Sequence, residues 1–213
     1  MKEAEEGESM QAKFAKTIIS ILRPYFDERL REDTRTGGLY LFDDELGDRA
    51  SCCTQSEAAC FYVLDEVLHG GDGIEISRKL AEDVRRRQLS NGAFEQPYYV
   101  KKGETGTVDI AEIGAAANSL YHITRLAKSG AAQDSLVRSA DYLLTQIAME
   151  NPGAVYKNPN AKEHDVLNGD MYAAHTWARA YQLTDKAEYL KPIEAVFTHL
   201  ADRFGRHQPG WWP

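Results

Sequence analysis

Carboxylates recur where helical segments begin, at points far apart in a chain of 213 residues. Asp109 and Glu112 enter one such segment, Glu57 lies in an earlier one and Asp170 in a later one. Hydrolysis of a glycosidic bond needs two carboxyl groups, one acting as an acid and the other as an ionised base or nucleophile. If the fold brings these segments together, Asp109 and Glu112 are candidate catalytic residues.

Histidine offers a second chemistry, the removal of a proton from a carbon beside a carbonyl group, as in epimerases and lyases. The candidate bases are His122, His164 and His175. His122 follows Tyr121 and is expected to be a surface or packing residue, whereas His164 lies in a long link and is expected to be exposed. We assign His175 to the catalytic set, and a hydrogen-bonded interior histidine is the alternative.

Structural roles compete with catalytic ones for the same side chains. Asp109 and Asn168 precede helical segments, where Asp and Asn accept hydrogen bonds from free backbone N–H groups as N-caps. Glu112 follows Asp109 by three positions, which is the spacing of a capping box. The helix dipole also favours Asp170 in a first turn. Capping and catalysis therefore both stay open for these residues.

Aromatic residues gather in the links between helical segments, where their flat faces can stack on sugar rings. Phe94 and Tyr156 each follow a glycine and are expected to plug the ends of helical hairpins. The candidate substrate-binding residues are Tyr98, Tyr99, Glu57, Asn168, Asp170, Trp211 and Trp212.

The chain repeats itself, which explains why similar residues recur at similar places. Pairs of alanines begin at Ala58, Ala116 and Ala173, and these positions are 58 and 57 residues apart. A glycine shortly before an aromatic residue recurs with a similar period, at Gly38, Gly92, Gly153 and Gly210. Two independent landmarks with one period indicate a structural repeat.

Each period contains two amphipathic helices with a short turn between them, which predicts an antiparallel hairpin. The second helices are expected over 74–88, 133–149 and 186–204. Another amphipathic helix precedes the hairpins, and Pro24 is expected to kink or split it. The fold class is therefore all-α, with about three hairpins and an N-terminal helix. The apolar face of that first helix carries Phe14, Ile18, Ile21, Leu22, Tyr25 and Leu30.

Composition excludes several classes of protein. The 25 Lys and Arg residues against 33 Asp and Glu residues give a net charge of −8, which argues against nucleic-acid or anionic-membrane partners. Residues 1–10 form an acidic tail, expected to be disordered and without the features of a secretory signal, ahead of a single domain over 11–213. Three cysteines in a C-C-x6-C pattern predict neither a disulfide framework nor a metal site. We expect a cytoplasmic protein that uses no metal or cofactor.

Hairpins at a period near 57, with Gly–aromatic links on one side, resemble the α/α-toroid superfamily of six-hairpin glycosidases, sugar epimerases and polysaccharide lyases. The segment Gln88-Leu-Ser-Asn-Gly92-Ala-Phe94 is similar to the Q-x3-G-x-W signature of squalene-cyclase repeats. The segment Val166-Leu-Asn-Gly169 looks like the hairpin start of glucuronyl C5-epimerase-like proteins. The resemblance covers residues 36–213. It implies that the first helix of each hairpin is an inner helix whose N-terminal end faces a cavity.

The chain supplies three hairpins where a complete toroid of this kind has six, so an open barrel, a longer protein or two mutually completing copies are expected. The resemblance implies a carbohydrate-active hydrolase, lyase or epimerase that acts on a sugar or uronic-acid ligand. One alternative is a non-catalytic repeat module that binds protein or glycan. Another is a terpenoid-cyclase-like domain, although the D-x-D-D acid motif is missing. The expected partners are a small-molecule or glycan ligand and either a second copy or the remainder of a longer chain.

Overall fold

The computed structural model describes residues 9–104, 106–158, 162 and 166–204. The described chain begins with helix α1 (Met10–Asp27) and strands β1 (Leu30–Asp33), β2 (Gly38–Asp43) and β3 (Asp48–Arg49). The helices that follow are α2 (Cys52–His69), α3 (Gly73–Arg87), α4 (Pro97–Lys101), α5 (Ile110–Ala127), α6 (Gly130–Leu144), α7 (Leu167–Thr184) and α8 (Lys191–Arg203). A short 3-10 helix, η1 (Ala187–Tyr189), lies between α7 and α8.

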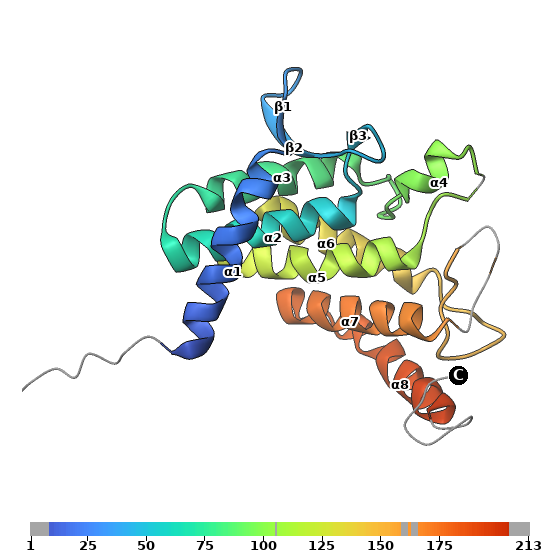
Figure 1. The fold of residues 1–213 in the computed structure, drawn as a ribbon. Coiled ribbons are helices and arrows are strands. Elements are labelled where there is room, and N and C mark those ends of the chain that lie inside the picture. Colours follow the sequence, from blue (N-terminus) through green and yellow to red (C-terminus); the bar gives the residue numbers. More distant parts are fainter. Residues whose placement is uncertain (1–8, 105, 159–161, 163–165, 205–213) are drawn as a thin grey trace, which may run out of the picture.

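Three antiparallel hairpins form the body of the molecule, and they pair α2 with α3, α5 with α6, and α7 with α8 (Figure 1). Helix α5 packs between α2 and α7, and α6 contacts both α3 and α7 from the other side. These contacts make α2, α5 and α7 the inner helices. The structure confirms three hairpins and an N-terminal helix. The last expected helix is divided into η1 and α8, where Pro192 occupies the first turn of α8 and favours a new helix start.

Small residues let the inner helices approach one another closely. Gly114 of α5 faces Tyr172 of α7, and a Cβ atom at position 114 would lie 2.3 Å from the Tyr172 Cβ atom. The alanine pairs that mark the repeat in the sequence are likewise buried. Because interiors are close-packed, these positions accept only small side chains. The repeat landmark is thus the contact surface of the inner helices.

The small sheet is the main departure from the all-helical expectation. Strand β2 pairs antiparallel with β1, where Leu30 lies opposite Leu41, and with β3 on its other side. Gln55 of α2 fastens the sheet, because its Oε1 atom accepts a hydrogen bond from the Leu41 N–H group at 3.1 Å. Its Nε2 atom donates to Asp83 of α3 at 2.7 Å. Such short strands are selected by tertiary contacts rather than by their own propensity.

Pro24 does not split the first helix, which runs without interruption from Met10 to Asp27. The residue lies in the last turn, so its missing N–H group removes a single hydrogen bond near the helix end. Helix α1 crosses α2 at one edge of the molecule (Figure 1).

The link glycines pack against the outer helices. A Cβ atom on Gly92 would lie 2.2 Å from the carbonyl oxygen of Arg138 in α6, and one on Gly153 would lie 2.4 Å from that of Ala195 in α8. Both glycines have a φ of +93°. Phe94 is fully buried, as expected for a plug. Tyr156 is only half-buried, and the neighbouring Val155 occupies the buried position instead.

One cluster of buried residues extends from Cys52 in α2 to Leu200 in α8, so the three hairpins share a core. Within the described part of the chain, no helix is both long enough and apolar enough to cross a bilayer.

Replacement of Gly92 by alanine tests the close contact between link and outer helix. The positive φ would cost an alanine at position 92 about 1–2 kcal/mol, and its Cβ atom would force a further backbone shift away from Arg138. We therefore expect the free energy of unfolding to decrease by about 3 kcal/mol. Gly103→Ala is the matched control, because Gly103 has a φ of +71° but open space around it. Urea denaturation of both variants measures the difference, and equal losses would contradict the packing role.

Candidate functional site

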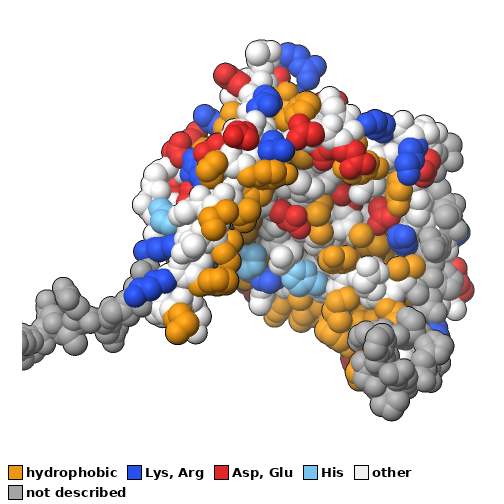
Figure 2. Space-filling model, in the orientation of Figure 1, with side chains coloured by type: hydrophobic (Ala, Val, Ile, Leu, Met, Phe, Trp, Pro, Cys, Tyr) orange, Lys and Arg blue, Asp and Glu red, His pale blue; other side chains and the backbone are white. Residues whose placement is uncertain are grey.

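The face formed by α5 and α7 brings two histidines together. His122 projects from α5 and His175 from α7, and both side chains are partly exposed. The positive charge of Arg179 lowers the pKa of each imidazole. Figure 2 shows histidine side chains gathered beside a basic side chain on the face of the molecule that α1 borders. The side chains come from neighbouring inner helices, so the repeat itself brings them together.

Both imidazoles are held in the neutral form at neutral pH. Burial is the main cause that lowers the pKa of His175, followed by the positive charge of Arg179 and by His122. Burial and Arg179 also lower the pKa of His122. The Nε atom of Arg179 donates a hydrogen bond to Nε2 of His175 at 3.1 Å. Because that Nε2 atom accepts, the proton of neutral His175 resides on Nδ1.

Tyr121 orients the guanidinium of Arg179. The Arg179 Cζ atom lies 4.0 Å from the centroid of the Tyr121 ring, within the range of a cation–π interaction. Arg125 donates a hydrogen bond to the Tyr121 hydroxyl at 3.0 Å. Tyr121 is itself buried, so the arginine rests on a fixed surface. Arg179 is thereby placed between α5 and α7 with its charge toward the two imidazoles.

The predicted carboxylates lie elsewhere, at the N-terminal end of α5. Asp109 is the N-cap of α5 and accepts a hydrogen bond from the Ala111 N–H group at 2.8 Å. Glu112 forms no capping box with Asp109. Its Oε1 atom accepts instead from the N–H group of Cys53 in the first turn of α2, at 2.8 Å. Both carboxylates are buried, with 6% and 4% of their surface exposed.

Glu112 of α5 accepts a hydrogen bond from the start of α2, and the burial that this requires disfavours its ionised form. Burial raises the pKa of its carboxyl above the ordinary value of 4.5, because the ionised form loses water. Hydrogen bonds from the Cys53 N–H group and from Ser51 oppose this effect, as does the charge of Arg87. Gln96 in the link before α4 approaches the second oxygen of Glu112 at 3.4 Å. The carboxyl thus joins α5, α2 and a link.

Asp170 is fully buried and anchors a link rather than facing an open surface. Its Oδ1 atom accepts a hydrogen bond from the Val155 N–H group at 2.7 Å, and its Oδ2 atom lies 3.6 Å from Nε2 of His199 in α8. Gln55 of α2 likewise accepts a hydrogen bond from a backbone N–H group outside its helix, that of Leu41. Gln55 and Asp170 each lie three residues before an alanine pair.

The other predicted binding residues are spread over the rim. Glu57 is exposed on α2, and Asn168 is exposed inside the first turn of α7, whose N-cap is Val166; the expectation that Asn168 caps this helix is therefore wrong. Tyr98 donates to Asp43 at 3.3 Å and so ties α4 to β2.

The Tyr99 hydroxyl donates to Asp109 at 3.4 Å, so these two predicted residues do meet. Trp211, Trp212 and His164 lie outside the described residues. The structure therefore brings Tyr99, Asp109 and Glu112 together at the start of α5. It places His175 on a different face, beside His122, expected to be a surface or packing residue.

Sequence reasoning missed Arg179 and underrated His122. Arg179 follows His175 by four residues, the spacing that places two side chains on one helix face. This spacing is present in the sequence and indicates that the two side chains are neighbours. The pairing of His122 with His175 depends on how α5 packs on α7, which a single helix pattern does not reveal.

The described residues contain no cluster of three or more His, Cys, Asp or Glu side chains that could hold a metal ion. The cysteines are unpaired, and burial raises the pKa of Cys52 to about 12, which keeps its thiol protonated.

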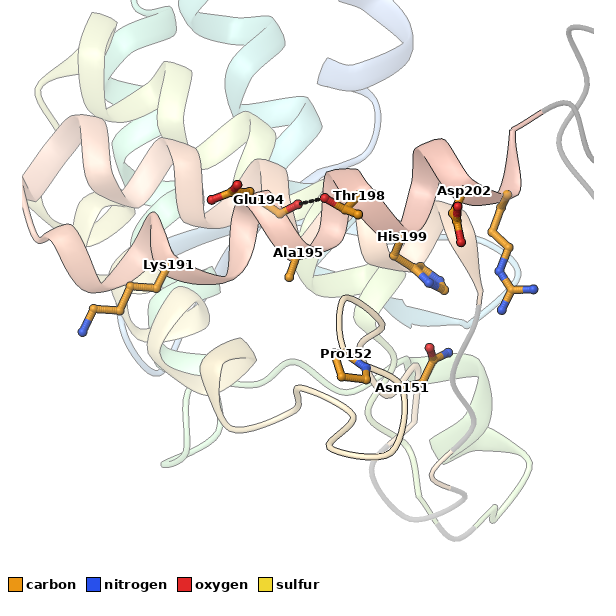
Figure 3. A pocket seen from close by; sticks show the side chains of 9 residues that line it. Asn151, Pro152, Lys191, Glu194, Ala195, Thr198, His199 and Asp202 are labelled. Atoms are coloured by element: carbon orange, nitrogen blue, oxygen red, sulfur yellow. Dashed lines mark hydrogen bonds between the residues drawn. The ribbon is translucent and has the colours of Figure 1, made fainter.

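Two of the hollows that the described residues line lie outside the histidine face. One, of about 490 Å³, is found where α2 begins and is lined by Arg49, Arg87 and Lys101 among others. The other, of about 540 Å³, lies along α8, where His199 points toward the loop of Asn151 and Pro152 (Figure 3). Neither hollow includes a predicted catalytic residue.

No protein-family model matches the chain, and no curated protein matches it. Among solved structures, it is similar to a GH76 α-mannanase of Bacteroides thetaiotaomicron, with a TM-score of 0.58, 8% identity and coverage of 91% of this chain and 60% of the mannanase chain. It is also similar to a sugar epimerase from a ruminal bacterium, with a TM-score of 0.50, 11% identity and coverage of 95% and 77%. The chain has the α/α-toroid fold.

Replacement of Glu112 by glutamine tests the cost of its burial. The folded-state pKa lies above the unfolded one, so the wild type loses stability as pH rises through that interval, and Glu112→Gln does not. We expect the stability of the variant relative to wild type to increase as pH rises above 4.5, the ordinary pKa of the carboxyl. Urea unfolding at several pH values measures this difference. Parallel pH profiles for the two proteins would show that the carboxyl is not desolvated.

Proposed function

We propose that this chain acts on a sugar or uronic-acid ligand by proton transfer beside a carbonyl group, as epimerases and lyases do. The observation that supports this most directly is the pair of neutral imidazoles on α5 and α7 with Arg179 beside them. The similarity in fold to a sugar epimerase and a mannanase agrees with a carbohydrate ligand.

The proposed mechanism divides the chemistry among three side chains. His122 acts as the base and takes the proton from the carbon next to the carbonyl, and the electron pair moves to the carbonyl oxygen. His175 donates a hydrogen bond to that oxygen from Nδ1, the nitrogen that carries its proton. The guanidinium of Arg179 stabilises the negative charge that develops. Delivery of a solvent proton to the opposite face of the carbon completes an epimerisation, and His122 then releases its proton to solvent. In an elimination, a neighbouring substituent instead leaves with its bonding electrons and takes up the proton from His122.

Glycoside hydrolysis by Asp109 and Glu112 fits the geometry less well. Both carboxylates are buried, and each accepts a backbone hydrogen bond at the start of an inner helix. We assign them to positioning of α2 and α5, together with Tyr99, which bonds Asp109 at the same end of α5. A non-catalytic glycan-binding module is the alternative, and turnover distinguishes it from the enzyme.

Exchange of a substrate proton with deuterated solvent tests the two histidines. A panel of aldoses and uronates is incubated with the protein in D2O, and NMR follows the signal of the proton beside the carbonyl. We expect exchange with wild type and a decrease of about 100-fold or more in His122→Asn and His175→Asn, because general acid–base catalysis contributes this much.

His69→Asn is the matched control for this experiment, because His69 lies at the end of α2 and bonds Asp65 rather than facing α7. Exchange that persists in both site variants, or that is absent from wild type with every sugar of the panel, would contradict the proposed chemistry.

The pH dependence of the same reaction follows from the lowered pKa values. Both imidazoles must be neutral, so activity rises as they lose their protons and reaches a plateau at higher pH. Since burial and Arg179 lower both pKa values from 6.5, the half-maximal rate should lie below pH 6.5. Arg179→Gln removes one cause and should move that midpoint upward. An unchanged midpoint in this variant would contradict the role of the guanidinium.

A further inference from the structure

Helix α1 exposes its apolar face. Phe14, Ile18, Ile21 and Tyr25 have exposed fractions of 68%, 40%, 69% and 51%, and they form the seam defined here as the α1 stripe. Leu22 beside the stripe is 39% exposed. Figure 2 shows a band of hydrophobic side chains along this edge of the molecule. Exposed apolar bands of this kind mark interaction surfaces.

The opposite face of α1 packs against the fold through apolar and polar contacts, since Ile19 is buried and the ring centroid of Phe26 lies 4.6 Å from that of Phe61. Arg23 forms ion pairs with Asp65 at the end of α2 and with Asp72, the latter at 3.2 Å. Asp27 accepts a hydrogen bond from the hydroxyl of Tyr62 at 2.9 Å. Ion pairs and hydrogen bonds thus add to the apolar contacts that hold α1 in place, while a second set of apolar residues remains on its outward face. The fold fixes the stripe toward the outside.

The stripe is self-complementary in its order. Its residues are separated by four, three and four positions and read aromatic, isoleucine, isoleucine, aromatic. Two copies of α1 in antiparallel orientation would therefore place Phe14 opposite Tyr25 and Ile18 opposite Ile21, twice over. A two-fold interface requires such a patch, because the same surface serves both partners. The spacing is also that of a coiled-coil seam.

Charges beside the stripe fit the same orientation. Lys13 lies near the start of α1 and Glu28 directly follows its end, both are exposed, and neither makes an ion pair within the described part of the chain. In an antiparallel pair, Lys13 of one copy lies on the same side as Glu28 of the other and at nearly the same height along the axis. In a parallel pair, Lys13 and Glu28 would lie at opposite ends of the seam and could not form this pair.

We propose that a second copy of this chain docks on the α1 stripe to form an antiparallel, two-fold homodimer. This inference concerns association only and is independent of the chemistry proposed for His122 and His175.

Sedimentation of the full chain from about 1 to about 100 μM tests the proposal. We expect a concentration-dependent dimer in wild type and a dissociation constant at least about 10-fold higher in Ile21→Lys, since the charge would lie in the seam. Val100→Lys on α4 is the matched control, because Val100 is apolar and 50% exposed but lies far along the chain from the stripe. Circular dichroism checks that each variant is folded.

Charge exchange tests the orientation. Lys13→Glu and Glu28→Lys should each weaken the dimer, and the double variant should recover it, because the pair is restored with its signs reversed. A monomer at every concentration, or a dimer that Ile21→Lys leaves intact, would overturn the proposal. Failure of the double variant to recover the dimer would overturn the antiparallel arrangement.

Discussion

Backbone N–H groups at the ends of the inner helices and in the links must be satisfied away from water, and the rest of the structure depends on this constraint. Gln55 accepts from the Leu41 N–H group and Asp170 from that of Val155. Each of these side chains lies on an inner helix and holds a neighbouring strand or link. A buried polar group without a partner is costly, so each bond fixes where its segment lies.

The same constraint explains which titratable residues remain available for chemistry. Asp109 and Glu112 are engaged at helix starts, and little of either side chain reaches the surface. On the face of α5 and α7, by contrast, His122 and His175 are partly exposed. The two carboxylates are thus engaged in hydrogen bonds that position helices, whereas the two imidazoles remain accessible from the surface.

Much of the fold could be predicted from the sequence, because the repeat reports packing directly. The alanine pairs at Ala116 and Ala173 are close-contact positions of inner helices, and the glycine at Gly92 is a contact with an outer helix. The sheet could not be predicted, since its pairing depends on a side-chain contact with Gln55 in the following helix, which strand patterns do not report.

The site was less predictable than the fold for a related reason. Asp109 and Glu112 carry the residue types expected at an active site, yet the contacts that bury them come from other repeats, as with Glu112 and Cys53. His122 shows the converse, because only the packing of α5 on α7 places it beside His175. Local patterns report which residues are polar, whereas tertiary contacts decide which of them remain accessible.

In the described links, the glycine that shortly precedes an aromatic residue contacts the outer helix of the hairpin that comes after it. Gly38 meets Arg86 of α3, Gly92 meets Arg138 of α6, and Gly153 meets Ala195 of α8. Each of these links therefore packs against the hairpin that follows it in the chain, as well as connecting it to the preceding helix. A structural unit that begins at the end of an outer helix, ahead of its link, keeps each of these glycine contacts within itself.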